Sequence, residues 1–287
     1  MKTLIAPTFL LLVVSLLFSL NTAASPEPVL QLQTGRHTAA IIRIAVDAKE
    51  QLLVTASHDK TALVWDLTAK GKLVQTLRPP LGAGDEGKLY AVAIKPLGDE
   101  VAVGGFTAPN GSDERIYIFN PRSGQLLRSL GQLPETVGHL AYSADGRYLA
   151  AALGKTGGIR VYDAASLQEV YRDSDYGSDS YSVEFDPHNR LLTTSFDGFI
   201  RLYQPNAALV KKAPACVTAK NCFLPPLKQA LTGGNKPFAA RFSPDAHLIA
   251  VGFGDTAAVQ VLNATNLSLA YAADTRTVTN GHVSSVA

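Results

Sequence analysis

The sequence is short of cysteine, of long basic runs and of long apolar runs. It has two cysteines among 287 residues, and its formal net charge at pH 7 is +2. No run of Lys and Arg exceeds two residues, whereas nucleic-acid-binding proteins usually carry a basic stripe. Beyond the N-terminal segment, no apolar stretch approaches the roughly 20 residues that span a bilayer. We therefore expect no nucleic-acid partner and no stable membrane span in the mature chain.

The first residues have the pattern of a secretory signal peptide. Lys2 gives a positive start, residues 9–20 form an apolar run, and small residues lead up to Ala24. Even counted over 5–20, the run is sixteen residues long, which is too short for a membrane anchor. We predict a signal peptide over 1–24 that is cleaved after Ala24, a periplasmic or secreted protein, and a linker or closing strand over 25–35.

The two cysteines, Cys216 and Cys222, are separated by five residues. A structural zinc site needs four ligands, and neither a second cysteine pair nor nearby histidines accompany these two. In an exported chain, two closely spaced cysteines predict a disulfide that closes a small loop. The six histidines are scattered over predicted turns and strand entries, so we expect no metal and no cofactor.

The rest of the sequence repeats one β-type unit five times. Each unit has a strand and turn, a second short strand, an alternating third strand that ends in a large apolar residue, and a fourth strand. The large apolar residues are Trp65, Phe119, Tyr162, Tyr203 and Leu262, at intervals of 54, 43, 41 and 59 residues. Two intervals match the propeller-blade period of about 40–45 residues, and the longer two contain insertions.

This periodicity predicts an all-β protein, a β-propeller of four-stranded antiparallel blades over 36–287. The fourth strands are expected at 72–78, 125–130, 167–172, 208–212 and 267–272. Residues 280–287 look like the opening of a sixth blade. An open last blade would leave an unpaired strand edge, so we expect the native propeller to continue beyond Ala287.

Three segments carry a resemblance to a known family. The stretch SHDKTALVWD (57–66) is close to the signature of the WD-repeat family, and YSADGRYLAAA (142–152) and FSPDAHLIAVG (242–252) are similar to its first turn. The resemblance implies a scaffold that binds proteins or peptides and does no chemistry itself.

The same resemblance implies a structural tetrad of His37, Ser57, Asp59 and Trp65. Ser, His and Asp in one unit also fit a hydrolase triad. No G-x-S-x-G elbow surrounds Ser57, however, and no oxyanion-hole segment is apparent, so we favour the structural role.

The later blades also resemble the propeller halves of bacterial proteins that pair WD-type repeats with a caspase-like peptidase domain. The similar segments are 235–245, 253–271 and 274–287. This resemblance implies that the chain is the recognition half of a peptidase whose catalytic domain lies beyond Ala287. Cys216 lacks the Q-A-C-x-G context of such peptidases. A third alternative is a small ligand or a cation bound in the propeller channel.

The long loops give the candidate binding face. By strand order, we expect loops 79–87, 106–114, 173–180 and 214–236 to share one face, where binding function concentrates. The candidate residues are Phe106, Asn110, Asp173, Asp175, Tyr176, Asp179 and Lys220.

The acidic string over 173–184 partly resembles a calcium loop. Its fifth and sixth positions are Gly177 and Ser178, where such a loop has Asp or Asn and then glycine. We favour a solvated loop at this place.

Overall fold

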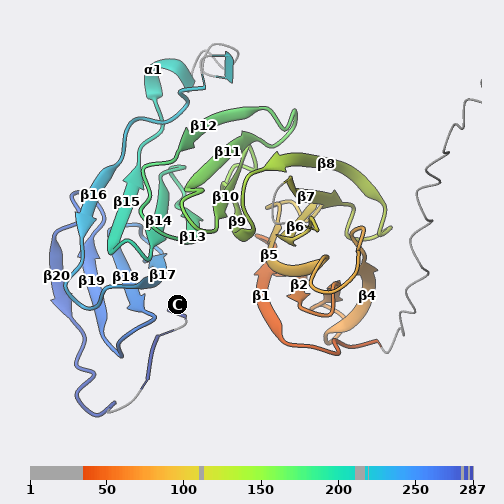
Figure 1. The fold of residues 1–287 in the computed structure, drawn as a ribbon, viewed down its shortest axis with the longest axis horizontal. Coiled ribbons are helices and arrows are strands. Elements are labelled where there is room, and N and C mark those ends of the chain that lie inside the picture. Colours follow the sequence, from red (N-terminus) through yellow and green to blue (C-terminus); the bar gives the residue numbers. More distant parts are fainter. Residues whose placement is uncertain are drawn as a thin grey trace, which may run out of the picture. The chain divides into compact units, whose positions relative to one another are not determined.

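The described residues of the computed structural model form five separate four-stranded antiparallel sheets, one for each predicted blade (Figure 1). The structure describes residues 35–109, 113–210, 217–218, 220–278, 281–283 and 285–286, which lie in one compact unit over 33–287. The predicted signal peptide, the 25–34 segment, Asn110 and Cys216 lie outside these residues. The prediction of an all-β propeller of four-stranded blades is confirmed.

The strands follow one another in sequence order within each blade. Blade 1 contains β1 (Ile41–Val46), β2 (Leu52–Ser57), β3 (Ala62–Asp66) and β4 (Lys72–Leu77). Blade 2 contains β5 (Lys88–Ile94), β6 (Val101–Phe106), β7 (Glu114–Phe119) and β8 (Leu126–Leu133). Blade 3 contains β9 (Val137–Tyr142), β10 (Tyr148–Leu153), β11 (Ile159–Asp163) and β12 (Glu169–Asp173). Blade 4 contains β13 (Ser180–Phe185), β14 (Leu191–Ser195), β15 (Phe199–Tyr203) and β16 (Leu227–Ala230). Blade 5 contains β17 (Pro237–Phe242), β18 (Leu248–Phe253), β19 (Val259–Asn263) and β20 (Leu269–Ala272).

The blades are held together by apolar layers between consecutive sheets. Strand β10 shows how the sequence produces them, because all six of its residues are buried. Tyr148, Ala150 and Ala152 face the layer shared with blade 4, whereas Leu149, Ala151 and Leu153 face the layer shared with blade 2. Side chains alternate between the two faces of a strand, so a strand covered on both faces needs a continuous apolar run.

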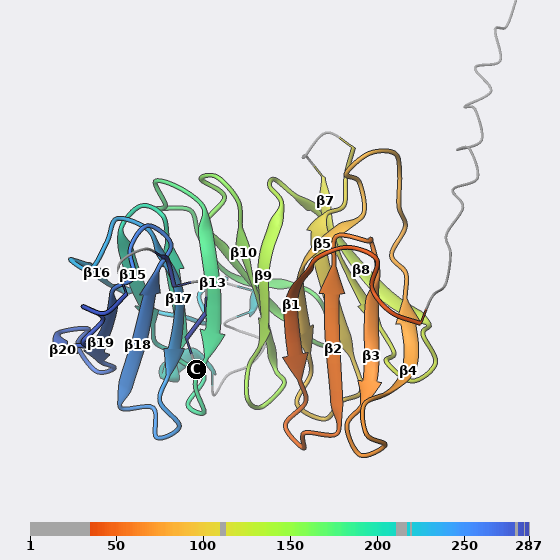
Figure 2. The ribbon, with the colours of Figure 1, turned by 90° about the horizontal axis from the view of Figure 1, so that it is seen from below.

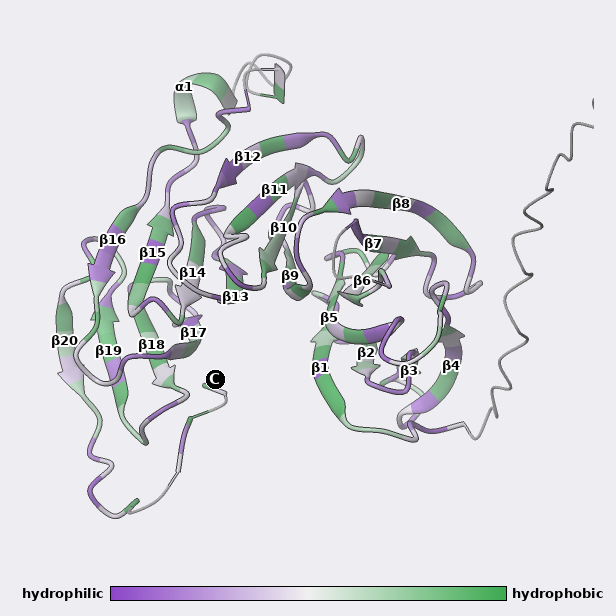
Figure 3. Ribbon diagram, viewed as in Figure 1, coloured by the Kyte–Doolittle hydropathy of each residue, from purple (hydrophilic) through white to green (hydrophobic). Residues whose placement is uncertain are grey.

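The outermost strands carry a weaker signal. Figure 3 shows polar residues along β12 and β16, in contrast to apolar β10 and β18. All four residues of β16 are exposed, so its sequence LKQA has no apolar pattern by which it could be recognised.

The fourth strand of blade 4, predicted at 208–212, is wrong because the strand at this edge has no apolar pattern. Residues 208–210 of the predicted strand belong to the short helix α1 (Ala207–Val210), and β16 takes the strand's place at the edge of the sheet. The cysteine-containing insertion therefore joins the third and fourth strands of blade 4 and does not link blade 4 to blade 5.

Strand direction assigns each loop to one of two faces. We call the face with the second-to-third-strand turns and the blade-to-blade connections the upper face, as it lies in Figure 2. The first-to-second and third-to-fourth turns form the lower face, which includes the described residues of the insertion over 204–226. Among the described helices, none has the length and apolar character needed to cross a membrane.

Candidate binding site

The predicted tetrad in blade 1 forms a hydrogen-bonded network with one unexpected member. His37 Nδ1 lies 2.8 Å from Asp59 Oδ2, and His37 Nε2 lies 2.7 Å from the hydroxyl of Thr55. Trp65 Nε1 donates to the same hydroxyl at 3.0 Å. Burial by itself would raise the pKa of Asp59, but hydrogen bonds from Thr61, Thr38 and His37 hold it below its ordinary value.

Ser57 does not occupy the centre of this network. Its hydroxyl donates to the Ala39 carbonyl at 3.2 Å and accepts the Asp59 amide at 3.1 Å, which stabilises the turn after β2. The residue that His37 and Trp65 contact is Thr55, which lies two residues before Ser57 on the same face of β2. Residues two apart on a strand share a face, so Ser57 was predicted in the place that Thr55 occupies. A serine nucleophile needs a hydrogen bond to the histidine that acts as its base. In blade 1, Nε2 of His37 is bonded to the hydroxyl of Thr55 and not to that of Ser57.

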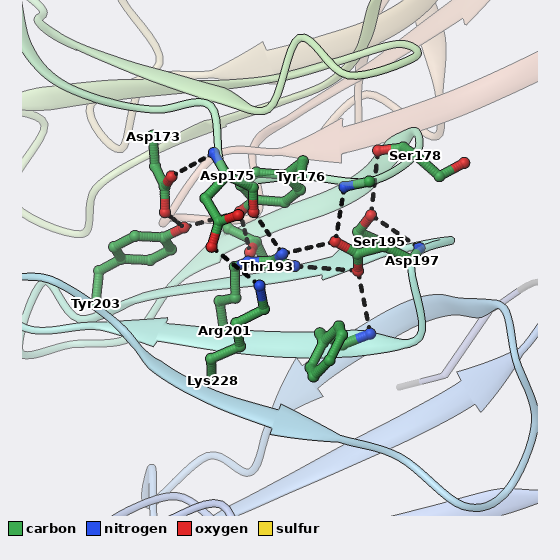
Figure 4. A network of polar contacts seen from close by, with 12 residues as sticks. Asp173, Asp175, Tyr176, Ser178, Thr193, Ser195, Asp197, Arg201, Tyr203 and Lys228 are labelled. Atoms are coloured by element: carbon green, nitrogen blue, oxygen red, sulfur yellow. Dashed lines mark hydrogen bonds and ion pairs between the residues drawn. The ribbon is translucent and has the colours of Figure 1, made fainter.

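A second buried network lies in blade 4 and contains two of the predicted binding residues (Figure 4). The Tyr203 hydroxyl donates to Asp173 Oδ2 at 2.7 Å and lies 2.9 Å from the Tyr176 hydroxyl, which in turn is 2.7 Å from the Thr193 hydroxyl. Tyr176 is only 4% exposed, so it cannot contact a partner. The prediction that Tyr176 belongs to the binding surface is therefore wrong.

Arg201 fixes the upper loop of blade 4 to this network. Its guanidinium donates to both carboxylate oxygens of Asp197, at 2.6 and 3.2 Å, and to the Asp175 carbonyl at 2.6 Å. It also lies 3.8 Å from the centre of the Tyr176 ring, within the range of a cation–π interaction. These contacts hold the loop over 174–179 against the buried network of blade 4.

The remaining predicted binding residues divide between the two faces. Phe106 ends β6 on the upper face, and the exposed carboxylate of Asp175 lies there 3.0 Å from Lys228 Nζ. Asp179 is half-buried and accepts the Lys155 amide at 2.5 Å. Lys220 belongs to the insertion, where its Nζ lies 3.7 Å from Glu169 Oε1 at the lower end of β12, so its assignment to the upper face is wrong.

The insertion is anchored beneath blades 3 and 4. Cys222 is fully buried, and its amide donates to the Val170 carbonyl at 3.2 Å. The Phe223 ring packs against Tyr148 at 5.3 Å and Tyr171 at 5.8 Å between ring centres. Since Cys216 lies outside the described residues, the disulfide stays a prediction.

The acidic string over 173–184 does not converge on one point. Asp173 pairs with Tyr203, whereas Glu184 lies on β13 and pairs with Arg241 at 3.1 Å. Across the described ranges, no three His, Cys, Asp or Glu side chains are grouped closely enough to hold a metal ion.

The feature that sequence reasoning missed is a set of β-bulges at the upper ends of the first strands. In each blade, the register between the first and second strands shifts by one residue near the start of the first strand. A bulge leaves one residue out of the ladder and redirects its side chain. The five extra residues are Ile42, Tyr90, Gly138, Tyr181 and Phe238.

All five bulge residues line one cavity of about 530 Å³ on the upper face, which we call the channel mouth. The other residues of its lining are Arg43, Thr136, Gly154, Asp179, Ser180 and Ser285. Tyr181 stacks on Phe196 at 4.2 Å and packs against Phe238 at 4.4 Å between ring centres. The three rings are partly exposed, so the mouth presents an aromatic surface.

A second cavity of about 420 Å³ is lined by the lower halves of the same first strands. Three of its polar side chains, Glu184, Arg241 and His139, are paired with one another or with the backbone. Glu184 accepts from Arg241 at 3.1 Å and from the Phe242 amide at 3.0 Å, and burial raises the pKa of this carboxyl. His139 Nδ1 accepts the Val183 amide at 3.1 Å, and burial holds the pKa of the imidazole well below its ordinary value.

Comparison with known proteins finds WD repeats. Residues 28–66 and 172–204 match the family described as WD domain, G-beta repeat. F-box/WD repeat-containing protein 4 of Homo sapiens is 30% identical over 163 residues, which is 55% of this chain and 38% of that protein. Its counterpart from Mus musculus is 29% identical over 187 residues, covering 63% and 43% of the two chains.

WD repeat-containing protein SL1-17 of Schistosoma mansoni is 26% identical over 161 residues, covering 56% of this chain and 49% of that protein. The matched region spans less than half the length of each of these three relatives. Together with the five blades, these similarities support a WD-repeat family for the chain.

Proposed function

We propose that the chain is a non-catalytic scaffold that binds a protein or peptide at the channel mouth. The observation that carries this proposal is the set of five bulges, which directs Tyr90, Tyr181 and Phe238 from three different blades into one cavity. Tyrosine and other large aromatic residues are enriched at protein interfaces, because they bury much area with few rotatable bonds. The long upper loops extend the same surface.

The rigidity of the surroundings supports this proposal. The loop over 174–179 is tied down by Arg201 and Asp197, so part of the rim of the mouth is already ordered before a partner arrives. Pre-ordered surfaces lose less conformational entropy on binding. The Ser, His and Asp residues that suggested a hydrolase serve structural networks instead.

Replacement of the aromatic rim tests the proposal. Peptides would be selected on the full chain from a random library, and their affinities measured by fluorescence polarisation. We expect Tyr181→Ser and Phe238→Ser each to weaken binding by about 30-fold, because aromatic anchors at interface centres contribute about 2 kcal/mol or more. Lys220→Ser, on the lower face, is the matched control and should bind normally. Full affinity in both aromatic variants would place binding elsewhere.

We further propose that the protein is exported and that Cys216 and Cys222 form a disulfide, as the N-terminal pattern suggests. Its similarity to propellers that accompany a caspase-like peptidase extends the proposal to a longer polypeptide with a peptidase domain beyond Ala287. The intact mass of the native protein, measured without reductant, tests these points together. We expect a chain that begins at Ser25, has no reactive thiol and is longer than the present sequence. Retention of Met1 together with two reactive thiols would contradict export.

A further inference from the structure

Among the described residues that line the channel mouth, Arg43 is the one arginine. It follows the bulge residue Ile42 on β1 and is partly buried. Its Nε is buried without a hydrogen-bond partner, and within the described part of the chain its guanidinium makes no ion pair. A buried cationic donor without a partner is costly, so a ligand that supplies an acceptor there gains the full interaction.

The charges around Arg43 do not neutralise it. Burial lowers the pKa of Arg43, and the nearby cation of Arg241 lowers it further. Arg241 itself is paired with Glu184. Among the described lining residues of the mouth, the one carboxylate is Asp179, which already accepts the Lys155 amide. The amide hydrogen bond occupies Asp179 without removing its charge, so the charges of the lining balance, and it is the guanidinium of Arg43, without an ion pair among the described residues, that offers a place for an anion.

The geometry points to a carboxylate as the ligand group. We propose that Arg43 is the anchor for a carboxylate of the recognised peptide, while Tyr181 and Phe238 pack against the residues beside it; this inference rests on the proposed function. The planar guanidinium binds a carboxylate through two parallel hydrogen bonds. A phosphate carries more charge and is usually met by a cluster of arginines, and Arg241 is already engaged.

The test uses one peptide from the random-library selection in three forms. The first has an internal Glu and an amidated C-terminus, the second has Gln at that place and a free C-terminal carboxylate, and the third has Gln and an amidated C-terminus. We expect one of the two carboxylate forms to bind about tenfold or more tightly than the neutral form, since a hydrogen bond to a charged group contributes about 1.5–3 kcal/mol. The form that binds more tightly shows whether the carboxylate comes from a Glu side chain or from the C-terminus of the peptide.

Arg43→Gln should remove this preference and Arg43→Lys should keep part of it, because the charge remains but the planar fork is lost. Arg122→Gln, an exposed arginine on the lower face, should keep the whole preference. Thermal melting checks that the variants are folded, and Arg43→Gln should melt at or slightly above the wild-type temperature because it removes a partly buried charge that has no described partner.

Two results would overturn the inference. Equal affinity for all three peptide forms would eliminate the carboxylate anchor and leave peptide recognition standing. Failure of the wild type to select any peptide would overturn both. A carboxylate preference that persists in Arg43→Gln would assign the anchor to another residue and would equally overturn the inference.

Discussion

Replacing Asp197 with alanine is expected to lower the free energy of unfolding by about 3–5 kcal/mol, because it leaves a buried charge without its partner. The side chain of Arg201 is fully buried and that of Asp197 is 9% exposed. Without the carboxylate, the guanidinium keeps the Asp175 carbonyl and the faces of the Tyr176 and Phe199 rings, and none of these carries a compensating charge (Figure 4). Chemical denaturation at neutral pH measures the change.

Asp175→Ala is the matched control for this prediction. Its carboxylate is 83% exposed and pairs with Lys228 at the surface, so its loss should cost below about 1 kcal/mol. Combining Asp197→Ala with Arg201→Met should restore part of the stability, because the unpaired charge is then gone. Similar destabilisation by the two aspartate substitutions would contradict the buried pair.

The same pair sets a pH dependence. Burial raises the pKa of Asp197, but hydrogen bonds from Arg201 and the Gly177 amide outweigh it and hold the pKa below its ordinary value. The ionised carboxylate therefore stabilises the fold above the unfolded-state pKa of about 3.9, and this contribution is lost as pH falls through the folded-state value. The difference between wild type and Asp197→Ala should shrink over that acid range.

The second large effect is expected from Phe223→Ala, which should lower the free energy of unfolding by about 3–5 kcal/mol. Phe223 is 2% exposed and fills the base of the layer between blades 3 and 4, against Tyr148, Tyr171 and Phe185. Removing the ring opens a cavity and removes the main apolar contact between the insertion and the blades.

Leu224→Ala is the neighbouring control, since this side chain is 43% exposed and should contribute little. If Phe223→Ala were as stable as Leu224→Ala, the insertion would not be part of the core. Denaturation midpoints and slopes of the two variants distinguish these outcomes.

The blades could be predicted from the sequence because their central strands are covered on both faces. Such strands are mostly buried and mainly apolar, as β10 shows most clearly, and one of them recurs in each blade. The outermost strand of blade 4 has no such pattern. Because its residues are exposed, no apolar pattern marks where the insertion ends and β16 begins. The insertion was therefore predicted to lie between blades 4 and 5, and Lys220 was wrongly assigned to the upper face.

The channel mouth could not be predicted for a different reason. Tyr90, Tyr181 and Phe238 lie in strands that read as ordinary alternating segments, and a bulge changes where a side chain points without changing the pattern. In the blade 1 network, Thr55 and Ser57 lie two residues apart and therefore on the same face of β2. The hydrogen bonds of His37 and Trp65 show that Thr55 is the member of the network. Tyr176 looked available because it lies in an acidic loop, yet its hydroxyl is bonded to Thr193 and Tyr203.

Site-specific photo-cross-linking tests the central claim, recognition at the channel mouth, most directly. A benzophenone amino acid would replace Tyr181 at the mouth or Lys220 on the lower face, and each protein would be irradiated with a peptide from the random-library selection. We predict a cross-link from position 181 and none from position 220, identified by mass spectrometry. A cross-link from position 220 with none from position 181 would contradict recognition at the mouth.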